Sequence, residues 1–175
     1  GLAGNVGKSL ALQVAENDRE FFVVELSSFQ LDGMEEFELD IGILLNITPD
    51  HLDRYQGEMK YYVASKMKIL QMVKDNGHFV YCQDDEIVAD EIEKRETNAK
   101  LIPFSIHKKL NEGAFIDNEN LLIQLNQNQY IMLLQELALQ GKHNIYNSMA
   151  SGIAARILEI RKETIRQSMT DFQNI

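Results

Sequence analysis

The sequence predicts an α/β fold in which helices flank a mostly parallel sheet and a small antiparallel β appendage follows. Two continuous apolar runs rich in β-branched residues, Phe21–Leu26 and Ile41–Ile47, are typical of strands covered on both faces of a parallel sheet. Helical stretches alternate with these strands, as in right-handed βαβ units. From about residue 113 onward, short strands separated by polar turns indicate antiparallel hairpins attached to the main sheet.

The first part of the chain is expected to supply the parallel part of the sheet. Besides the two apolar runs, the expected strands are His78–Cys82 and Lys100–Phe104. The expected helices are Val6–Glu16, Glu58–Lys74 and a third that runs from a cap at Asp84 or Asp85 to about Arg95. Asn5 is a candidate cap for the first helix.

The second part of the chain follows a different pattern. Its expected strands are Ala114–Ile116, Leu121–Leu125 and Gln129–Leu134, and its expected helices run from about His143 to Glu159 and from Lys162 to the end. There are no internal repeats and no long linkers. Because 175 residues with 45% hydrophobic content can bury the core of one domain, we expect a single domain over residues 1–175.

Composition excludes several classes of protein. A net charge of −10 argues against nucleic-acid binding, although an anionic nucleotide can still bind through a metal ion and backbone N–H groups. The single cysteine, Cys82, excludes an intramolecular disulfide and fits a reducing compartment. No apolar run approaches the roughly 20 residues that span a bilayer and no signal peptide is visible, so we expect a cytoplasmic protein without a membrane partner.

One lysine falls on the apolar face of the helix expected over Glu58–Lys74. That face is formed at helical spacing by Met59, Tyr62, Val63, Leu70 and Val73. Lys66 lies among them, and a buried ammonium is costly unless it is paired. Either its amine reaches solvent from the edge of the face, or it faces a site where it pairs with a carboxylate or reacts with carbon dioxide. A carbamate formed in that way would be a metal-binding anion. The spacing alone does not decide whether the amine reaches solvent or faces a site.

Polar side chains gather where two expected strands end. Glu25 closes the first apolar strand, and His51 follows the second within a Pro-containing turn. Ligands of open α/β sheets bind at the carboxyl ends of strands, so Glu25 and His51 are candidate ligands of a divalent metal that holds nucleotide phosphates, with Lys66 nearby. Taken singly, each has an ordinary alternative, because a strand-end Glu is often a solvated edge or cap and a loop His is usually no ligand.

The N-terminal segment resembles a phosphate-binding loop but fails in its register. Residues 4–9 read GNVGKS, yet a Walker A loop requires glycine where Leu2 stands. Lys8 is therefore not predicted to be a phosphate-binding lysine. What remains is a Gly-rich turn leading into a helix N-terminus, which is a generic anion site.

Five segments, taken in order, resemble the Mur ligase family and most closely its D-glutamate-adding members. They are GNVG at 4–7, ELSSFQL at 25–31, LNITPDHLDRY at 45–55, YVASKMKI at 62–69 and GKHNIYN at 141–147. The second segment is the most discriminating among the sister ligases, whereas the final His-Asn-x-x-Asn is shared more widely. The similarity covers essentially the whole chain and implies a P-loop-NTPase-like central domain.

The resemblance implies roles for residues that match the family's motifs. Lys66 matches a lysine that family members carry as a carbamate, so that Lys66 and His51 would be catalytic and Glu25, His51 and Lys66 would hold Mg²⁺. The residues implied at the adenine end of ATP are Asn144, Asn147 and, beside them, His143. The residues implied along the UDP-sugar substrate are Asn5, near its pyrophosphate, and Ser27 and Gln30.

The implied reaction uses ATP and Mg²⁺ to join D-glutamate to UDP-N-acetylmuramoyl-L-alanine through an acyl phosphate, in bacterial peptidoglycan synthesis. The family's P-loop and its N- and C-terminal domains have no counterpart in this sequence, so we expect a truncated central domain that is inactive alone and monomeric. One alternative is a nucleotide- or metal-binding module without ligase chemistry. Another is a sister Mur or folylpolyglutamate-type ligase, against which the Ser-Ser-Phe-Gln string argues.

Overall fold

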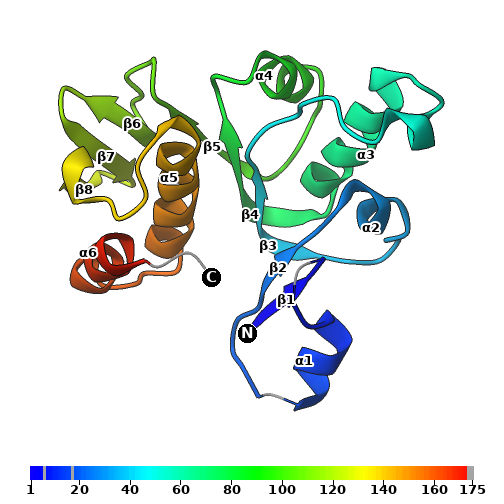
Figure 1. The fold of residues 1–175 in the computed structure, drawn as a ribbon, viewed down its shortest axis with the longest axis horizontal. Coiled ribbons are helices and arrows are strands. Elements are labelled where there is room, and N and C mark those ends of the chain that lie inside the picture. The colour runs from blue at the N-terminus through cyan, green and yellow to red at the C-terminus, as the bar shows by residue number, and fades with distance from the viewer. Residues whose placement is uncertain (6, 17, 173–175) are drawn as a thin grey trace. The chain divides into compact units, whose positions relative to one another are not determined.

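The computed structural model comprises two compact units, and Figure 1 shows its helices and strands. The structure describes residues 1–5, 7–16 and 18–172. Unit 1 comprises Gly1–Phe37 and Pro49–Lys68. Unit 2 comprises Glu38–Thr48 and the described chain from Ile69 onward.

Within its described residues, unit 1 contains a small parallel sheet and four helical segments. Strand β1 (Leu2–Gly4) pairs in parallel with β2 (Val23–Glu25). The helical segments are α1 (Leu10–Glu16), α2 (Ser28–Asp32), the 3-10 helix η1 (Leu52–Tyr55) and α3 (Met59–Gln71), whose last turn lies in unit 2. The buried hydrophobic side chains of this unit are Ala3, Leu31, Tyr55, Tyr62, Val63 and Met67.

Two elements of unit 1 are shorter than the sequence predicts. The helix expected from Val6 begins at Leu10, and the Ser9 Oγ accepts a hydrogen bond from the Leu12 amide at 3.2 Å. Ser9 rather than Asn5 therefore satisfies an amide of the first turn, while Val6 itself lies outside the described residues. The strand expected over Phe21–Leu26 is reduced to β2, because its partner β1 offers only three residues for pairing.

Unit 2 is built on a six-stranded sheet with the order β3-β4-β5-β6-β7-β8. The strands are β3 (Leu39–Leu44), β4 (Val73–Cys82), β5 (Lys100–Ser105), β6 (Gly113–Asp117), β7 (Asn120–Leu125) and β8 (Asn128–Leu133). Pairing is parallel from β3 to β6 and antiparallel from β6 to β8. The predicted α/β class is thus confirmed, and the antiparallel hairpins continue the parallel sheet.

The boundary between α3 and β4 differs from the prediction. The helical pattern extended to Lys74, but α3 ends at Gln71 and β4 begins at Val73. Val73 pairs with Leu39 in the parallel ladder, a position that suits a β-branched residue. Val73 is buried, as its apolar character predicts, but it is buried in the sheet and not on the helix.

The helical elements of unit 2 are α4 (Glu86–Glu93), η2 (Leu134–Glu136), α5 (Lys142–Ile157) and α6 (Lys162–Asp171). Of the two candidate caps for α4, the structure selects Asp85, whose carboxylate accepts from the Val88 amide at 3.0 Å. The last predicted helix reached the chain end, but residues 173–175 lie outside the described part. Across the described chain, no helix combines the length and apolar character needed to cross a bilayer.

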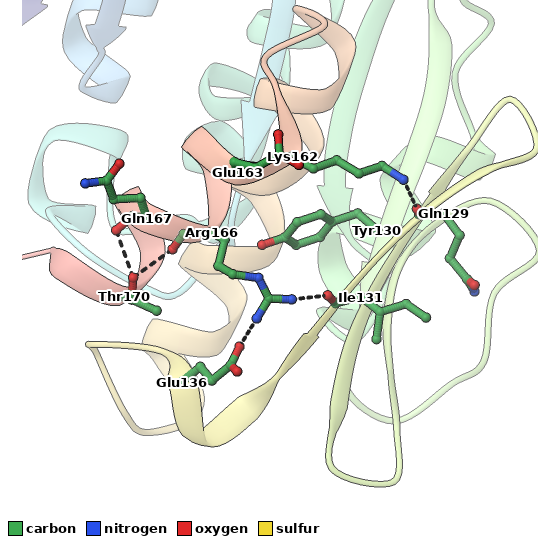
Figure 2. A pocket seen from close by; sticks show the side chains of 9 residues that line it. All are labelled: Gln129, Tyr130, Ile131, Glu136, Lys162, Glu163, Arg166, Gln167 and Thr170. Carbon is green, nitrogen blue, oxygen red and sulfur yellow. Dashed lines mark hydrogen bonds and ion pairs between the residues drawn. The ribbon is translucent and has the colours of Figure 1, made fainter.

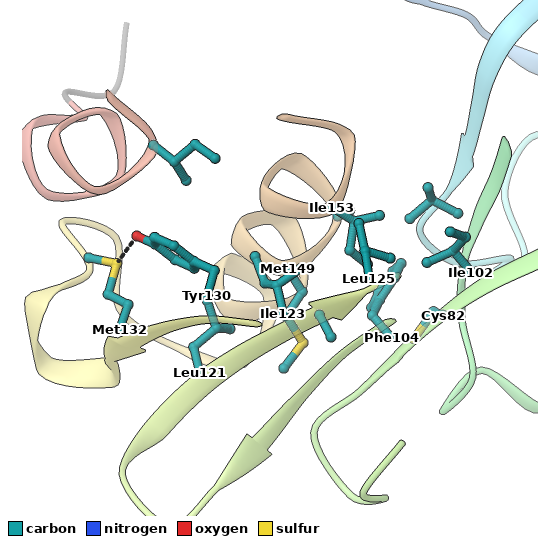
Figure 3. Packing of buried hydrophobic residues seen from close by; sticks show 14 of the residues in the cluster. Cys82, Ile102, Phe104, Leu121, Ile123, Leu125, Tyr130, Met132, Met149 and Ile153 are labelled. Atoms are coloured by element: carbon teal, nitrogen blue, oxygen red, sulfur yellow. Dashed lines mark hydrogen bonds between the residues drawn. The ribbon is translucent and has the colours of Figure 1, made fainter. Parts of the chain in front are cut away.

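Helix α5 packs on the sheet and closes the core of unit 2 (Figure 3). Met149 and Ile153 of α5 are completely buried and lie near Ile123 of β7 and Phe104 of β5. A Cβ atom at Gly152 would lie 2.4 Å from the Ile123 Cδ1. The absence of a side chain at Gly152 therefore allows the close approach of α5 to β7, and this packing fixes the helix that carries the predicted adenine-side residues.

Candidate functional site

Glu25 and Asn5 lie together at the ends of the two strands of unit 1. In the ladder Gly4 pairs with Glu25, and the Asn5 amide donates to the Glu25 carbonyl at 2.8 Å. Gly4 has a φ of 123°, and a Cβ atom there would lie 2.0 Å from that carbonyl oxygen. Glycine is therefore required for this turn, which holds the Gly-Asn segment against the strand that presents the exposed Glu25.

Ser27 and Gln30 form a capping box at the start of α2. The Gln30 amide donates to the Ser27 Oγ at 3.3 Å, and the Ser27 amide donates to the Gln30 Oε1 at 2.9 Å. Both side chains are half-buried. The structure thus gives the two residues a helix-capping role, and their contact with a substrate stays a prediction.

His51 stands at the start of η1 in a left-handed backbone conformation, with φ 48° and ψ 33°. Its side chain is 60% exposed, and its Nε2 lies 3.5 Å from an Asp50 carboxylate oxygen. The imidazole also packs at 5.6 Å from the ring of Phe29, which follows the Glu25 segment. His51 caps no helix amide through its side chain, so the imidazole is accessible for another use.

Lys66 is half-buried on α3, at the edge of the apolar face. Its Nζ lies 5.7 Å from the centre of the Tyr62 ring, within the range of a cation–π contact. Among the described residues, no carboxylate lies within ion-pair distance of this amine. The position of Lys66 is compatible with both expected uses of its amine, the solvated ammonium and the site-facing group.

Burial and nearby negative charge also act on Tyr62 beneath Lys66. Burial, and to a lesser extent Asp50 and Tyr55, raise the pKa of Tyr62. Its hydroxyl therefore stays protonated at neutral pH. The Lys66 amine faces a neutral ring and not a phenolate.

Hydrogen bonds between buried residues and one exposed carboxylate, that of Asp32, connect the helical segments of unit 1. We call this group the Tyr55 cluster; it comprises Tyr55, Asp32, Ser65 and Ser28. The Tyr55 hydroxyl donates to the Asp32 carboxylate at 3.0 Å and lies 3.2 Å from the Ser65 Oγ. The Ser65 hydroxyl in turn donates to the Ser28 carbonyl at 2.9 Å. Burial raises the pKa of Asp32, but hydrogen bonds from Lys68, Ser65 and Tyr55 outweigh it and hold that pKa below its usual value.

The Tyr55 cluster unites the segments that carry the three predicted metal-site residues. Ser65 is adjacent to Lys66, the η1 segment that begins after His51 ends at Tyr55, and Ser28 follows Glu25 by one short loop. Sequence reasoning missed this cluster because its members are ordinary residue types separated by up to 37 positions. The signal that could have found them is that Tyr55 and Ser65 lie inside the matched motif segments.

The donor set suits an open metal site. The described residues include no group of three or more His, Cys, Asp or Glu side chains that could hold a metal ion. No other described side chain pairs with the exposed Glu25 carboxylate, and the His51 imidazole is also exposed. Mg²⁺ usually keeps several waters and takes one or two carboxylates from the protein. The exposed carboxylate of Glu25 and imidazole of His51 are of the ligand types that a hydrated divalent ion accepts, and their role as metal ligands stays a prediction.

The predicted adenine-side residues lie on the first turns of α5, in unit 2. Gly141 precedes the helix at its N-cap position with a φ of 96° and provides no side-chain cap. His143 and Asn147 are exposed, and the Asn144 Nδ2 donates to the Gln140 carbonyl at 2.9 Å. Residues three positions apart share a helix face, so Asn144 and Asn147 present their amides on the same side.

A pocket of about 730 Å³ in unit 2 contains none of the predicted site residues (Figure 2). It lies between β8, η2 and α6. Its two cations are engaged by the protein, since Lys162 donates to the Gln129 carbonyl and Arg166 pairs with Glu136 and donates to the Ile131 carbonyl. These contacts cover carbonyls of the edge strand β8, which indicates a structural role for both cations.

Comparison with known proteins identifies the family. Residues 4–155 match the Mur ligase middle domain. A UDP-N-acetylmuramoylalanine--D-glutamate ligase from Christiangramia forsetii is 48% identical over 175 residues, which are 100% of this chain and 39% of that protein. A ligase of the same name from Bacteroides fragilis is 46% identical over the same shares of the two chains. The chain thus spans about two fifths of the length of these curated relatives.

Solved structures show the same fold at low sequence identity. MurF from Acinetobacter baumannii aligns with a TM-score of 0.73 and 17% identity, over 99% of this chain and 40% of that one. MurF ligase from Thermotoga maritima, solved in complex with ADP, aligns with a TM-score of 0.68 and 17% identity, over 99% of this chain and 42% of that one. The middle-domain family matches most of the chain, and the chain therefore belongs to the Mur ligase middle-domain family.

Proposed function

We propose that this chain is the central, ATP-binding domain of a bacterial ligase that joins D-glutamate to UDP-N-acetylmuramoyl-L-alanine in peptidoglycan synthesis. The observation that carries the proposal is 48% identity, over the whole chain, to a relative named for that reaction. Residues 1–175 would form one truncated domain of the full-length protein, inactive without the remainder. Its proposed nucleotide substrates and its single, buried Cys82 fit the bacterial cytoplasm, where we propose that the protein is a monomer.

We assign the metal-holding role to Glu25, His51 and Lys66. The exposed Glu25 carboxylate and the accessible His51 imidazole support it, as does the joining of their segments to that of Lys66 by the Tyr55 cluster. Carbamylation of Lys66 would replace a cation with an oxygen ligand. Bound Mg²⁺ would neutralise the approach of two anions and stabilise charge on the transferring phosphoryl group.

We assign the adenine end of ATP to Asn144, Asn147 and His143 on α5. The pyrophosphate of the UDP-sugar is assigned to Asn5, whose turn is held against Glu25. Ser27 and Gln30 would line the approach of that substrate with the outer surface of the capping box.

The proposed reaction has two steps. The terminal carboxylate of UDP-N-acetylmuramoyl-L-alanine attacks the γ-phosphorus of ATP, which gives an acyl phosphate and ADP. The amine of D-glutamate then attacks the acyl carbon, forming the amide bond and releasing phosphate and a proton. Residues that orient the two anions are needed because the ground-state reactants repel each other.

The test measures ADP release by the full-length protein. We expect ATP consumption only when UDP-N-acetylmuramoyl-L-alanine and D-glutamate are both present. Lys66→Ala should reduce turnover by about 10²-fold or more, with partial recovery on addition of short-chain carboxylic acids that replace the carbamate. Lys60→Ala is the matched control, because Lys60 lies on the same helix and pairs only at the surface, 3.6 Å from Glu58.

Other outcomes would change the assignment. Equal turnover with L-lysine or D-alanyl-D-alanine in place of D-glutamate would indicate a sister ligase. ATP binding without any turnover, unaffected by Lys66→Ala, would indicate a nucleotide-binding module. Full activity of Lys66→Ala would remove the role assigned to this lysine.

A further inference from the structure

The Tyr146 hydroxyl of α5 donates to the Asp84 carboxylate at 2.9 Å, across 62 positions of the chain. Asp84 follows β4 and also binds the end of β5. Its carboxylate accepts from the Ser105 hydroxyl at 2.5 Å and from the Ile106 amide at 2.7 Å. One carboxylate of unit 2 therefore holds the ends of two neighbouring strands and the early part of α5.

The surroundings of Asp84 make this a rigid connection. Ser105 is completely buried, and its Oγ also accepts from the amides of His107 and Lys108 at 3.0 and 2.8 Å. The Tyr146 ring packs at 5.9 Å from the buried ring of Phe104. Asp84 is half-buried, and a carboxylate that accepts from three donors forms stronger hydrogen bonds than a neutral acceptor.

The ionisation of the two groups agrees with a stable bond. Burial raises the pKa of Asp84, but hydrogen bonds from Ser105, Ile106 and Tyr146 outweigh it and lower that pKa. Burial and the hydrogen bond to Asp84 both raise the pKa of Tyr146. At neutral pH the acceptor is therefore charged and the donor keeps its proton.

This bond ties the start of α5 to the strand ends. Gly141 supplies no side-chain cap, and the Asn144 amide bonds to Gln140 just before the helix. Among the described residues, the Tyr146–Asp84 bond is the side-chain hydrogen bond that joins the first two turns of α5 to the strand ends. Tyr146 lies directly before Asn147 and two positions after Asn144.

We propose that Asp84 and Tyr146 are positioning residues that set the affinity for the adenine end of ATP by fixing the first turns of α5 against the strand ends. The inference rests on the proposed function, which assigns Asn144 and Asn147 to adenine. Neither residue of the pair needs to touch the nucleotide. The bond orients the helix that does.

The test compares Tyr146→Phe with Tyr130→Phe in the full-length protein. Tyr130 serves as the control because it also lies in unit 2, and among the described residues its hydroxyl donates to the Met132 sulfur at 3.5 Å and to no carboxylate. We expect Tyr146→Phe to raise the KM for ATP about tenfold with kcat changed less than about twofold. The inhibition constant of inorganic triphosphate, which lacks adenine, should stay unchanged. Tyr130→Phe should leave the KM for ATP and the inhibition constant of triphosphate at their wild-type values.

A second variant separates positioning from stability. Ser105→Ala removes a different donor from the same carboxylate without touching α5, so it should lower the melting temperature while leaving the KM for ATP unchanged. An equal rise in the ATP and triphosphate constants of Tyr146→Phe, or a rise in the KM for ATP of Ser105→Ala as large as that of Tyr146→Phe, would overturn the positioning role.

Asn147→Ala tests the assignment of α5 to adenine separately from the positioning role of Asp84 and Tyr146. If Asn147→Ala weakens ATP binding while Tyr146→Phe does not, the positioning role is wrong and the assignment of α5 to adenine stands. If Asn147→Ala and Asn144→Ala both leave ATP binding unchanged, the assignment itself is wrong and the inference falls with it.

Discussion

The Tyr55 hydroxyl lies 3.2 Å from the Ser65 Oγ, and both side chains are buried. Through Asp32 and the Ser28 carbonyl, this pair joins η1, α2 and α3. The segments of the three proposed metal-site residues meet here. The arrangement of that site therefore depends on hydrogen bonds between protein groups, and not on a bound metal or nucleotide.

Replacing Tyr55 by Phe should therefore destabilise the protein and disturb the proposed site. The change removes the hydroxyl that contacts the buried Ser65 Oγ and donates to the exposed Asp32 carboxylate, and we expect the free energy of unfolding to fall by about 1 kcal/mol, measured by urea denaturation. Tyr61→Phe is the control, because Tyr61 is 43% exposed on the neighbouring turn of α3. Equal stability of the two variants would contradict the role given to the Tyr55 cluster.

Much of the fold could be predicted from the sequence because its strongest signals are local. The apolar, β-branched run Ile41–Ile47 contains most of β3, and the polar turns after residue 113 separate β6, β7 and β8. The prediction was wrong where pairing decides the outcome. Val73 fits a helical period as well as a strand, and only its pairing with Leu39 assigns it to β4.

The candidate site could be predicted as a set of residue types but not as a set of contacts. The identities of Glu25, His51 and Lys66 come from motifs at strand ends. Their supporting residues come from far along the chain, as the 23-position separation of Tyr55 from Asp32 and the 62-position separation of Tyr146 from Asp84 illustrate. No local pattern encodes such pairs, since each depends on the packing of complete elements.

Gly4→Ala should unfold the turn beside Glu25. An added Cβ atom would lie 2.0 Å from the Glu25 carbonyl oxygen, and the φ of 123° is unfavourable for alanine. We expect a loss of at least about 2 kcal/mol in the free energy of unfolding, together with faster hydrogen exchange of the Asn5 amide. Gly33→Ala is the control, because its Cβ atom would lie 3.8 Å from the nearest atom, the Gln30 carbonyl oxygen. Slow exchange at Asn5 in Gly4→Ala would show that the turn does not need glycine.

Stability should fall as the pH is lowered through the range in which histidine titrates, because of His78. Burial, and to a lesser extent Lys100 on the adjacent strand, lower the pKa of His78 below 6.5, whereas Glu112 opposes the shift. The unfolded state then binds the proton more readily, so the stabilisation is present above the unfolded pKa and is lost as the pH falls from about 7 to 5. NMR titration of the His78 ring should give a pKa below 6.5.

His78→Gln provides the control for this pH dependence. The variant lacks the titrating group, so its free energy of unfolding should change less than that of the wild type between about pH 7 and 5. Identical slopes for the two proteins would show that other groups cause the dependence.

Asp85→Ala should cost more than the loss of an ordinary helix cap, because the Asp85 carboxylate accepts two backbone hydrogen bonds. One comes from the Val88 amide of α4 at 3.0 Å and the other from the Ile47 amide, beyond β3, at 2.9 Å. A cap alone contributes about 1 kcal/mol, so we expect a loss of about 2–3 kcal/mol for Asp85→Ala in urea denaturation. The stability of Asp85→Asn should lie between those of the wild type and Asp85→Ala, because asparagine caps well but offers one oxygen for two donors. Glu86→Ala, at the exposed first turn, is the control and should change stability by less than about 1 kcal/mol. If Asp85→Asn matches the wild type, the bond from Ile47 contributes nothing, and the carboxylate acts as a helix cap only.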